Sequence, residues 1–334
     1  MNISLIIQKL AEKHELRSPE SLKWFSMVIL IAVVICILYS LFVTSCLWSC
    51  LTKSSTFILL FSQALNDLYA LSQSAWQPIL RLGGVSKESF LPDRWLSVIH
   101  GTFELISLPH YIVIALNRAL FLIDHTKMGS VFSARKTTFA CIAMWVIPIL
   151  INITLHVFAP EDDDGFYLFK ASTLEMGPRS MGSDFDSYIS CVFDFSFYAS
   201  AVLVVLIYVT AIVIHSYKRR DTRAVLSLPQ NCAKFGMEMR LTIVCLVNLV
   251  LPAMVTIMDF VWPDRGIVGG FIYALLTMGD NSVNTIVLPI FSRLLREAIK
   301  KRILGIRAVC GGRKTVGDKR VLFKKPRSGT TRTT

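Results

Sequence analysis

Long apolar runs alternate with short polar links along most of the chain. Each run is long enough to cross the hydrocarbon core of a bilayer, which takes about 20 residues of α-helix. The seven runs cover residues 24–48, 57–82, 95–123, 138–158, 191–215, 241–262 and 267–291. In lipid, a helix satisfies all of its own backbone hydrogen-bonding groups. The pattern therefore predicts an all-α membrane protein, a bundle of seven transmembrane helices.

The polar links give this bundle an orientation. An odd number of spans places the two chain ends on opposite sides, and basic residues gather in alternate links. These basic residues are Lys53, Lys127, Arg135, Lys136, Lys218, Arg219, Arg220, Arg223, Lys234 and Arg240. The link 159–190 is acidic instead. Because lysine and arginine mark cytoplasmic loops, we expect an outside N-terminus, a cytoplasmic C-terminus and a multi-pass location in the plasma membrane.

Four segments follow from this orientation. We expect an extracellular N-terminus over 1–23 and the seven-helix membrane domain over 24–291. Residues 292–310 place apolar side chains on one helical face and basic ones on the other, which predicts a juxtamembrane amphipathic helix on the lipid bilayer. Residues 311–334 are basic and polar without periodicity, which indicates a disordered cytoplasmic tail.

Composition narrows the function classes. The chain is 53% hydrophobic and only 17% charged, unlike a soluble domain. Its net charge of +12 follows the predicted cytoplasmic segments, so we expect no nucleic-acid partner. The eight cysteines show neither metal-ligand spacing nor a disulfide framework. No catalytic or phosphate-binding motif is present, so we expect no enzyme activity, no cofactor and no metal.

One polar stripe runs along the third apolar segment. His100, Glu104, Ser107, Tyr111 and Arg118 lie at offsets of 0, 4, 7, 11 and 18. At 3.6 residues per turn these positions project from nearly one face, over roughly 27 Å. A single-faced row of polar groups points into a bundle rather than toward lipid.

A second set of polar residues lies at mid-run positions in three of the predicted helices. A carboxyl group at that depth is costly unless it has partners, which favours one shared polar core. Its members are Asp67, Ser107, Asp280, Asn281 and Asn284. The core could hold water, a cation or a proton, or it could only hydrogen-bond the helices together.

A third set lies toward the expected outer ends of the helices. Pockets between helices, walled by aromatic side chains with a few polar groups, suit small organic ligands. The candidate ligand-binding residues are Trp76, Gln77, His100, Glu104, Asp194, Tyr198 and Tyr273. The alternative for each residue is a buried hydrogen bond to a neighbouring helix.

The chain resembles the rhodopsin-like seven-helix receptors, and in particular the nematode serpentine chemoreceptors of class x. The resemblance covers about residues 25 to 305. Asn117-Arg118 stands where these receptors have an acid-arginine-aromatic triplet, and Val131-Phe132-Ser133 resembles a loop phrase of the worm family. Further matches are Asp67, Trp145, Tyr208 and the segment Asn281-Ser282-Val283-Asn284. The chain departs from the pattern at Thr285, where these receptors have proline.

The resemblance implies a chemosensory receptor that binds an external small molecule and activates a heterotrimeric G protein. Asn117, Arg118 and Tyr208 would then lie at the G-protein face. Asp67, Ser107 and Asn284 would form the cation cluster of the family. Two other functions stay open: a proton- or ion-coupled transporter, for which Asp67, Asp280 and Glu104 speak, and a receptor-like protein that does not signal.

Overall fold

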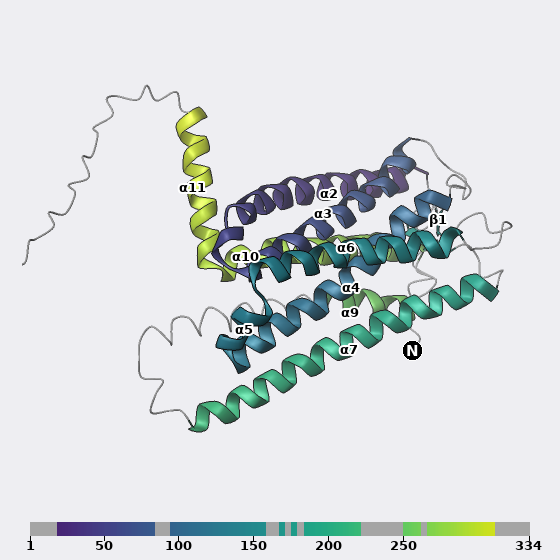
Figure 1. The fold of residues 1–334 in the computed structure, drawn as a ribbon. Coiled ribbons are helices and arrows are strands. Elements are labelled where there is room, and N and C mark those ends of the chain that lie inside the picture. The colour runs from purple at the N-terminus through teal and green to yellow at the C-terminus, as the bar shows by residue number, and fades with distance from the viewer. Residues whose placement is uncertain are drawn as a thin grey trace, which may run out of the picture.

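The computed structural model describes residues 19–83, 94–157, 167–170, 175–178, 184–221, 250–261 and 266–310. Within these ranges, long helices lie side by side in a bundle (Figure 1). They are α2 (Pro19–Trp48), α3 (Ser55–Leu82), α4 (Arg94–Ile123), α6 (Ala134–Val157), α7 (Asp184–Asp221), α9 (Val250–Val261) and α10 (Gly266–Phe291). Each contains or overlaps one predicted run. For the sixth run, only 250–261 is described.

Four stretches of helix in the described residues are long and apolar enough to cross a membrane. They are Lys23–Lys53, Leu105–Ile123, Ala134–Thr154 and Phe195–Ile214. They belong to α2, α4, α6 and α7. Helices α3 and α10, which also coincide with predicted runs, carry most of the polar core described below. The structure therefore supports a multi-span membrane protein.

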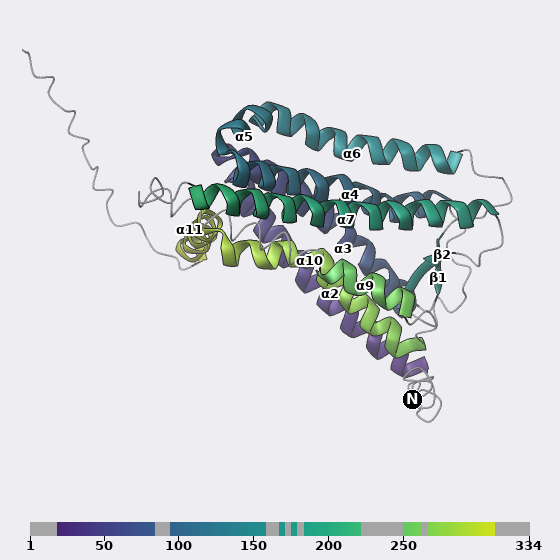
Figure 2. The same ribbon diagram turned by 90° about the horizontal axis from the view of Figure 1, so that it is seen from below.

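Shorter elements lie at the two ends of the bundle. Helices α5 (His125–Val131) and α11 (Arg293–Cys310) lie at one end, and α11 runs across the direction of the bundle helices (Figures 1 and 2). The short helix η1 (Leu51–Lys53) joins α2 to α3. Strands β1 (Tyr167–Lys170) and β2 (Glu175–Pro178) form an antiparallel hairpin at the opposite end (Figure 2).

Neither the hairpin nor α5 was predicted. The link 159–190 was described only as an acidic loop between two runs, but it contains the hairpin, in which Tyr167 pairs with Pro178 and Lys170 with Glu175. The link after Ile123 was likewise read as a loop, although His125–Val131 is helical. Both elements are too short to show a hydrophobic period. Helix α11 spans the segment for which an amphipathic helix was expected. The tail 311–334 and the first 18 residues lie outside the described part.

Helix α4 holds the centre of one half of the bundle, where it packs against α3, α6 and α7. Helix α10 packs against α2, α3 and α9 in the other half. Helix α3 therefore touches both halves. Polar side chains of α3 can reach α4 on one side and α10 on the other.

The bundle is apolar outside and partly polar inside. On α2, Val33, Ser40 and Val43 are buried, while Ile31 and Ile35 on the opposite face are exposed. The same holds for α6 and α7, whose exposed side chains are mostly valine, isoleucine, leucine and phenylalanine. A surface of this kind fits hydrocarbon, because water would make so large an apolar area costly.

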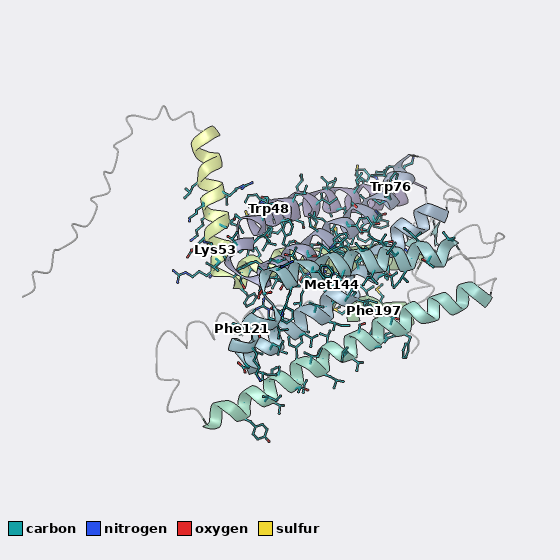
Figure 3. The ribbon with its side chains drawn as sticks, viewed as in Figure 1. Trp48, Lys53, Trp76, Phe121, Met144 and Phe197 are labelled. Carbon is teal, nitrogen blue, oxygen red and sulfur yellow. The ribbon has the colours of Figure 1, made fainter. Side chains whose placement is uncertain are left out.

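Tryptophans mark both ends of α2. Trp24 is 63% exposed and Trp48 is 65% exposed. Their separation of 24 residues corresponds to about 36 Å of helix, which matches a hydrocarbon core with its interfaces. Trp48 also meets the ring of Phe61 edge-on, with centroids 5.3 Å apart. Both positions suit aromatic interfacial anchors, and Figure 3 labels Trp48.

Candidate functional site

Asp67 of α3 is the centre of the polar core. Its carboxyl group is buried and accepts two side-chain hydrogen bonds. Gln63 Nε2, one helical turn earlier, donates to Oδ1 at 2.7 Å. Asn284 Nδ2 of α10 donates to Oδ2 at 2.9 Å. The expected contact between the second and seventh predicted helices therefore exists, while Gln63 was missed although its spacing of four residues from Asp67 could have suggested it.

Helix α4 joins this core through Ser107. Asn66 Nδ2 of α3 donates to Ser107 Oγ at 2.6 Å and also reaches the Phe103 carbonyl oxygen at 3.3 Å. Ser107 Oγ donates back to the Phe103 carbonyl at 3.0 Å, so its hydroxyl is satisfied inside its own helix. Tyr111 follows Ser107 by four residues and lies on the same face of α4. Ser107 thus belongs to the same polar region as Asp67.

One face of α10 adds the remaining members. Thr277, Asp280, Asn281 and Asn284 lie at spacings of three and four residues, which places them on one side of a helix. Asp280 interacts electrostatically with Asp67. Among the described residues, Thr277 Oγ1, Asp280 Oδ1 and Asn281 Nδ2 are buried atoms with no hydrogen-bond partner. The core thus has both donors and acceptors available for water or a cation.

A second network joins α3, α4 and α6 through His110, which the sequence analysis did not single out. His110 Nδ1 lies 2.8 Å from the Ile106 carbonyl oxygen, and Nε2 lies 2.8 Å from Ser62 Oγ. Trp145 Nε1 donates to Ser62 Oγ at 3.0 Å. A carbonyl only accepts, so Nδ1 carries the proton and Nε2 accepts from Ser62. Every polar atom of this row then has a partner.

Other buried pairs connect the helices along their length. Thr285 Oγ1 of α10 donates to the Ser282 carbonyl, so Ser40 of α2 donates to Thr285 at 2.9 Å. Asn152 Nδ2 of α6 donates to Thr102 Oγ1 of α4 at 2.8 Å. Thr285 therefore uses its hydroxyl to join α10 to α2. Buried Asn152, within a glycosylation sequon, is committed to a neighbouring helix.

Arg118 and Asn117 are buried in the last turns of α4, and Tyr208 is buried within α7. Arg118, only 1% exposed, is the largest fully buried side chain in the described part of the chain. Asn117 Oδ1 accepts a hydrogen bond from Thr56 Oγ1 of α3 at 3.0 Å. Tyr208 packs with Ala115 and Val204. Arg118 therefore lies inward, as the polar stripe indicates, and Asn117 fastens this end of α4 to α3.

The residues expected around an outer ligand are placed less completely. Side chains of Gln77, His100, Glu104 and Asp194 lie outside the described part. The remaining three have described positions: Trp76 of α3 is 49% exposed, Tyr198 of α7 is 47% exposed, and Tyr273 of α10 is half-buried. Figure 3 shows Trp76 near the end of α3 that is farther from α11. The ligand-binding set stays a prediction.

Cys46, Cys50 and Cys141, which are buried free thiols, lie in apolar clusters rather than in this polar core. In the described ranges, no three His, Cys, Asp or Glu side chains are grouped closely enough to hold a metal ion.

Comparison with known proteins bears on the fold. No protein-family model matches the chain. No curated protein matches it either. The structure is similar to that of squid rhodopsin, with a TM-score of 0.65 over 89% of this chain and 89% of that chain, at 15% sequence identity. The chain therefore has the helical-bundle fold of a rhodopsin.

Proposed function

We propose that this chain is a chemosensory G-protein-coupled receptor with seven transmembrane helices, close to the class x serpentine receptors of nematodes. Its N-terminus would lie outside the plasma membrane and its C-terminus in the cytoplasm. An external small molecule would bind near the end that carries the hairpin. A heterotrimeric G protein would bind near the end that carries α5 and α11.

The observation that carries this proposal is the buried Arg118 in a rhodopsin-type bundle. Arg118 lies five residues before the end of α4 and is 1% exposed. An arginine at the end of a span would ordinarily extend to the interface, where its charge is hydrated. Holding it inside costs stability, and that cost is understandable if outward movement of neighbouring helices exposes the guanidinium to a partner.

The polar core contains the hydrogen bonds between helices that such a movement would rearrange. Asp67, Asn284 and Ser107 connect three helices through buried side-chain bonds, while several polar atoms of α10 keep unused capacity. Two packings that differ by a rearrangement of these bonds would be close in free energy. A ligand that binds one packing more tightly would shift the population toward it.

The experiment is a nucleotide-exchange assay on G proteins, with cells expressing the wild type screened against small volatile and water-soluble compounds. Compounds that stimulate exchange are then tested on Arg118→Ala. We expect Arg118→Ala to lose most of the agonist-driven exchange at equal surface expression and equal thermal stability. Equal responses from the two proteins would overturn the role of Arg118.

Arg135→Ala is the matched control. Arg135 is exposed at the first turn of α6, so its removal changes charge at the same end of the bundle without opening the interior. We expect it to keep the maximal response. A loss of response in Arg135→Ala equal to that in Arg118→Ala would mean that surface charge, not the buried guanidinium, supports coupling.

Ion-coupled transport is the second candidate function, and one observation favours it. Asp67 and Asp280 lie on facing helices and interact electrostatically, and Asp280 Oδ1 has no partner among the described residues. Two interacting carboxyl groups can exchange a proton or hold a cation. Flux into proteoliposomes that contain only this protein, driven by a pH or sodium gradient and lost in Asp280→Asn, would support transport over signalling.

A further inference from the structure

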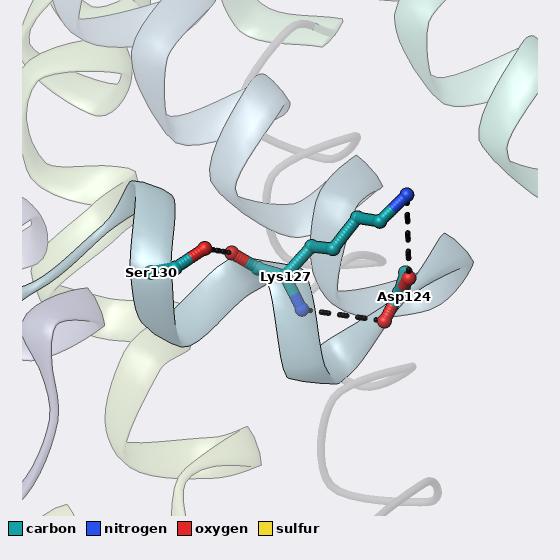
Figure 4. A network of polar contacts seen from close by, with 3 residues as sticks. All are labelled: Asp124, Lys127 and Ser130. Atoms are coloured by element: carbon teal, nitrogen blue, oxygen red, sulfur yellow. Dashed lines mark hydrogen bonds and ion pairs between the residues drawn. The ribbon is translucent and has the colours of Figure 1, made fainter.

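Ser130 lies in the last turn of α5, on the surface of the bundle end that the proposed function places in the cytoplasm. Its side chain is exposed, and Oγ donates to the Lys127 carbonyl oxygen at 2.8 Å. Figure 4 shows Ser130 with Lys127 and Asp124 on the outside of the short helix. The hydroxyl therefore faces solvent and makes only a local bond within its own turn.

Two lysines lie close to the turn that carries Ser130. Lys127, three residues earlier, has a side chain that is 76% exposed. Its Nζ lies 3.9 Å from Asp124 Oδ2. Lys136 comes from the first turn of α6, and its Nζ donates to the Ser130 carbonyl oxygen at 2.9 Å. The Lys136 ammonium group thus contacts the backbone of Ser130, while the Lys127 side chain, one turn earlier on α5, extends toward Asp124 (Figure 4).

The next serine is bound differently. Ser133 is half-buried, and its Oγ accepts from the Lys136 amide at 3.4 Å at the start of α6. Phe132 beside it packs against the cluster of Leu59, Ile114 and Met144. Opening the chain at Ser133 would pull Phe132 from this apolar cluster, whereas opening it at Ser130 breaks only bonds of a seven-residue helix.

We propose that Ser130 is a phosphorylation site for a basophilic protein kinase, and that Lys127 and Lys136 bind the resulting phosphate. The inference rests on the proposed function, because a cytoplasmic kinase must reach α5. The basic residue three positions before the serine, Lys127, is what the acidic substrate groove of such a kinase recognises. Val131, directly after the serine, is exposed and supplies an apolar contact.

The reaction itself needs only ATP as co-reactant. The Ser130 hydroxyl gives its proton to the base of the kinase, and Oγ forms a bond to the γ-phosphorus as the bond to ADP breaks. The product carries about −1.5 to −2 charges and acceptor oxygens for ammonium groups. Lys127 would leave Asp124 for the closer and stronger anion, and Lys136 would move from the carbonyl oxygen to the phosphate.

The consequence is a change of charge on this end of the bundle. Lys127, Arg135 and Lys136 make the region around α5 basic, and Asp124 offsets one of these charges. A phosphate would cancel most of the remainder.

The first experiment maps the site in the full-length receptor, purified into lipid nanodiscs. The catalytic subunit of a cAMP-dependent protein kinase with magnesium and ATP serves as the probe, and phosphopeptides are located by mass spectrometry. We expect phosphate on Ser130 in the wild type and in Ser133→Ala, none at this loop in Ser130→Ala, and a several-fold slower reaction in Lys127→Ala. Phosphate on Ser133 in place of Ser130, or no phosphate on the loop, would overturn the inference.

The second experiment tests whether Lys136 binds the phosphate. The phosphorylated receptor is treated with a broad-specificity phosphatase, and loss of phosphate is followed with time. Lys136→Ala should lose phosphate several-fold faster than the wild type, because Lys136 lies outside the kinase recognition segment and acts only on the product. Lys300→Ala, an exposed lysine of α11, is the control and should match the wild type. Equal rates for Lys136→Ala and wild type would rule out phosphate binding by Lys136.

These results separate the inference from the function on which it rests. A receptor that stimulates nucleotide exchange but takes no phosphate at Ser130 contradicts the inference and leaves the function standing. A protein that is phosphorylated at Ser130 in nanodiscs but stimulates no exchange contradicts the function instead.

Discussion

Asn284 donates a 2.9 Å hydrogen bond to Asp67 across 217 residues of sequence, and this bond fastens α10 to α3 inside the bundle. Gln63 donates to the other oxygen of the same carboxyl group. Asp67 therefore uses both oxygens as acceptors for two different amides.

Asp67→Asn should destabilise the protein. An asparagine offers one acceptor oxygen, so either Gln63 or Asn284 loses its partner, and an amide that stays buried without one costs about 1–3 kcal/mol. Thermal unfolding in detergent should show a lower midpoint for Asp67→Asn. Glu297→Gln, which removes only the exposed Arg293–Glu297 pair at 2.9 Å, should shift the midpoint little. Equal shifts in the two variants would show that the Asp67 bonds contribute no more than a surface pair.

Ser62→Ala should disturb three helices at once. It leaves the Trp145 N–H without its acceptor and His110 Nε2 without its donor, at a cost of about 1–3 kcal/mol for each buried group. Trp145→Phe removes only the indole N–H that donates to Ser62. The double variant Ser62→Ala/Trp145→Phe should be less destabilised than the sum of the single variants, because the lost N–H is counted once. Strict additivity of the three unfolding free energies would contradict the network.

Leu295→Ala tests the attachment of α11. Leu295 is fully buried in a cluster with Leu47, Phe57 and Leu288 at the end of the bundle. Truncating a buried leucine leaves a cavity and costs about 2–5 kcal/mol. Leu304→Ala on the same helix is the control, because Leu304 is 62% exposed. We expect a clearly lower unfolding midpoint only for Leu295→Ala, and limited proteolysis after residue 292 should become faster in that variant alone.

Thr56→Val should loosen the joint between α3 and α4 close to Arg118. Valine keeps the shape of threonine but cannot donate, so Asn117 Oδ1 loses its bond at a cost of about 1 kcal/mol. The basal rate of G-protein nucleotide exchange should rise, because the buried end of α4 is held less firmly. Thr138→Val is the control. Thr138 is exposed on α6, and its hydroxyl donates only to the Ala134 carbonyl of the same helix. An unchanged basal rate at reduced stability would separate this joint from signalling.

Much of the bundle was predictable because apolar runs have a simple physical limit. A stretch that must cross lipid is long and apolar, so the C-terminal ends of α2, α3, α4 and α10 agree with those of the runs to the residue. The inward position of Arg118 was predictable from its place on the polar stripe. The meeting of Asp67 with Asn284 followed from the cost of an isolated carboxyl group in hydrocarbon.

The hydrogen bonds of His110 could not be predicted, because they depend on how α3 and α6 pack against α4. His110 lies directly after Pro109 and one residue before Tyr111 of the stripe, so spacing alone placed it off the polar face. Its ring turns toward Ser62 because α3 and α6 meet α4 there. The short elements α5 and the hairpin were not predicted for a different reason. Four to seven residues carry too little periodicity to separate helix, strand and loop.

The contact between α4 and α7 differs in kind from the bonds that join α3, α4 and α6. It includes the apolar side chains of Ala115, Ala119, Val204 and Ala211 together with the buried ring of Tyr208. Dispersion between the apolar side chains has no preferred direction, so this part of the contact should resist a small rotation of α7 less than a hydrogen bond would. Helices α3, α4 and α6 are held together by hydrogen bonds. They would then keep their positions relative to one another while α7 moves.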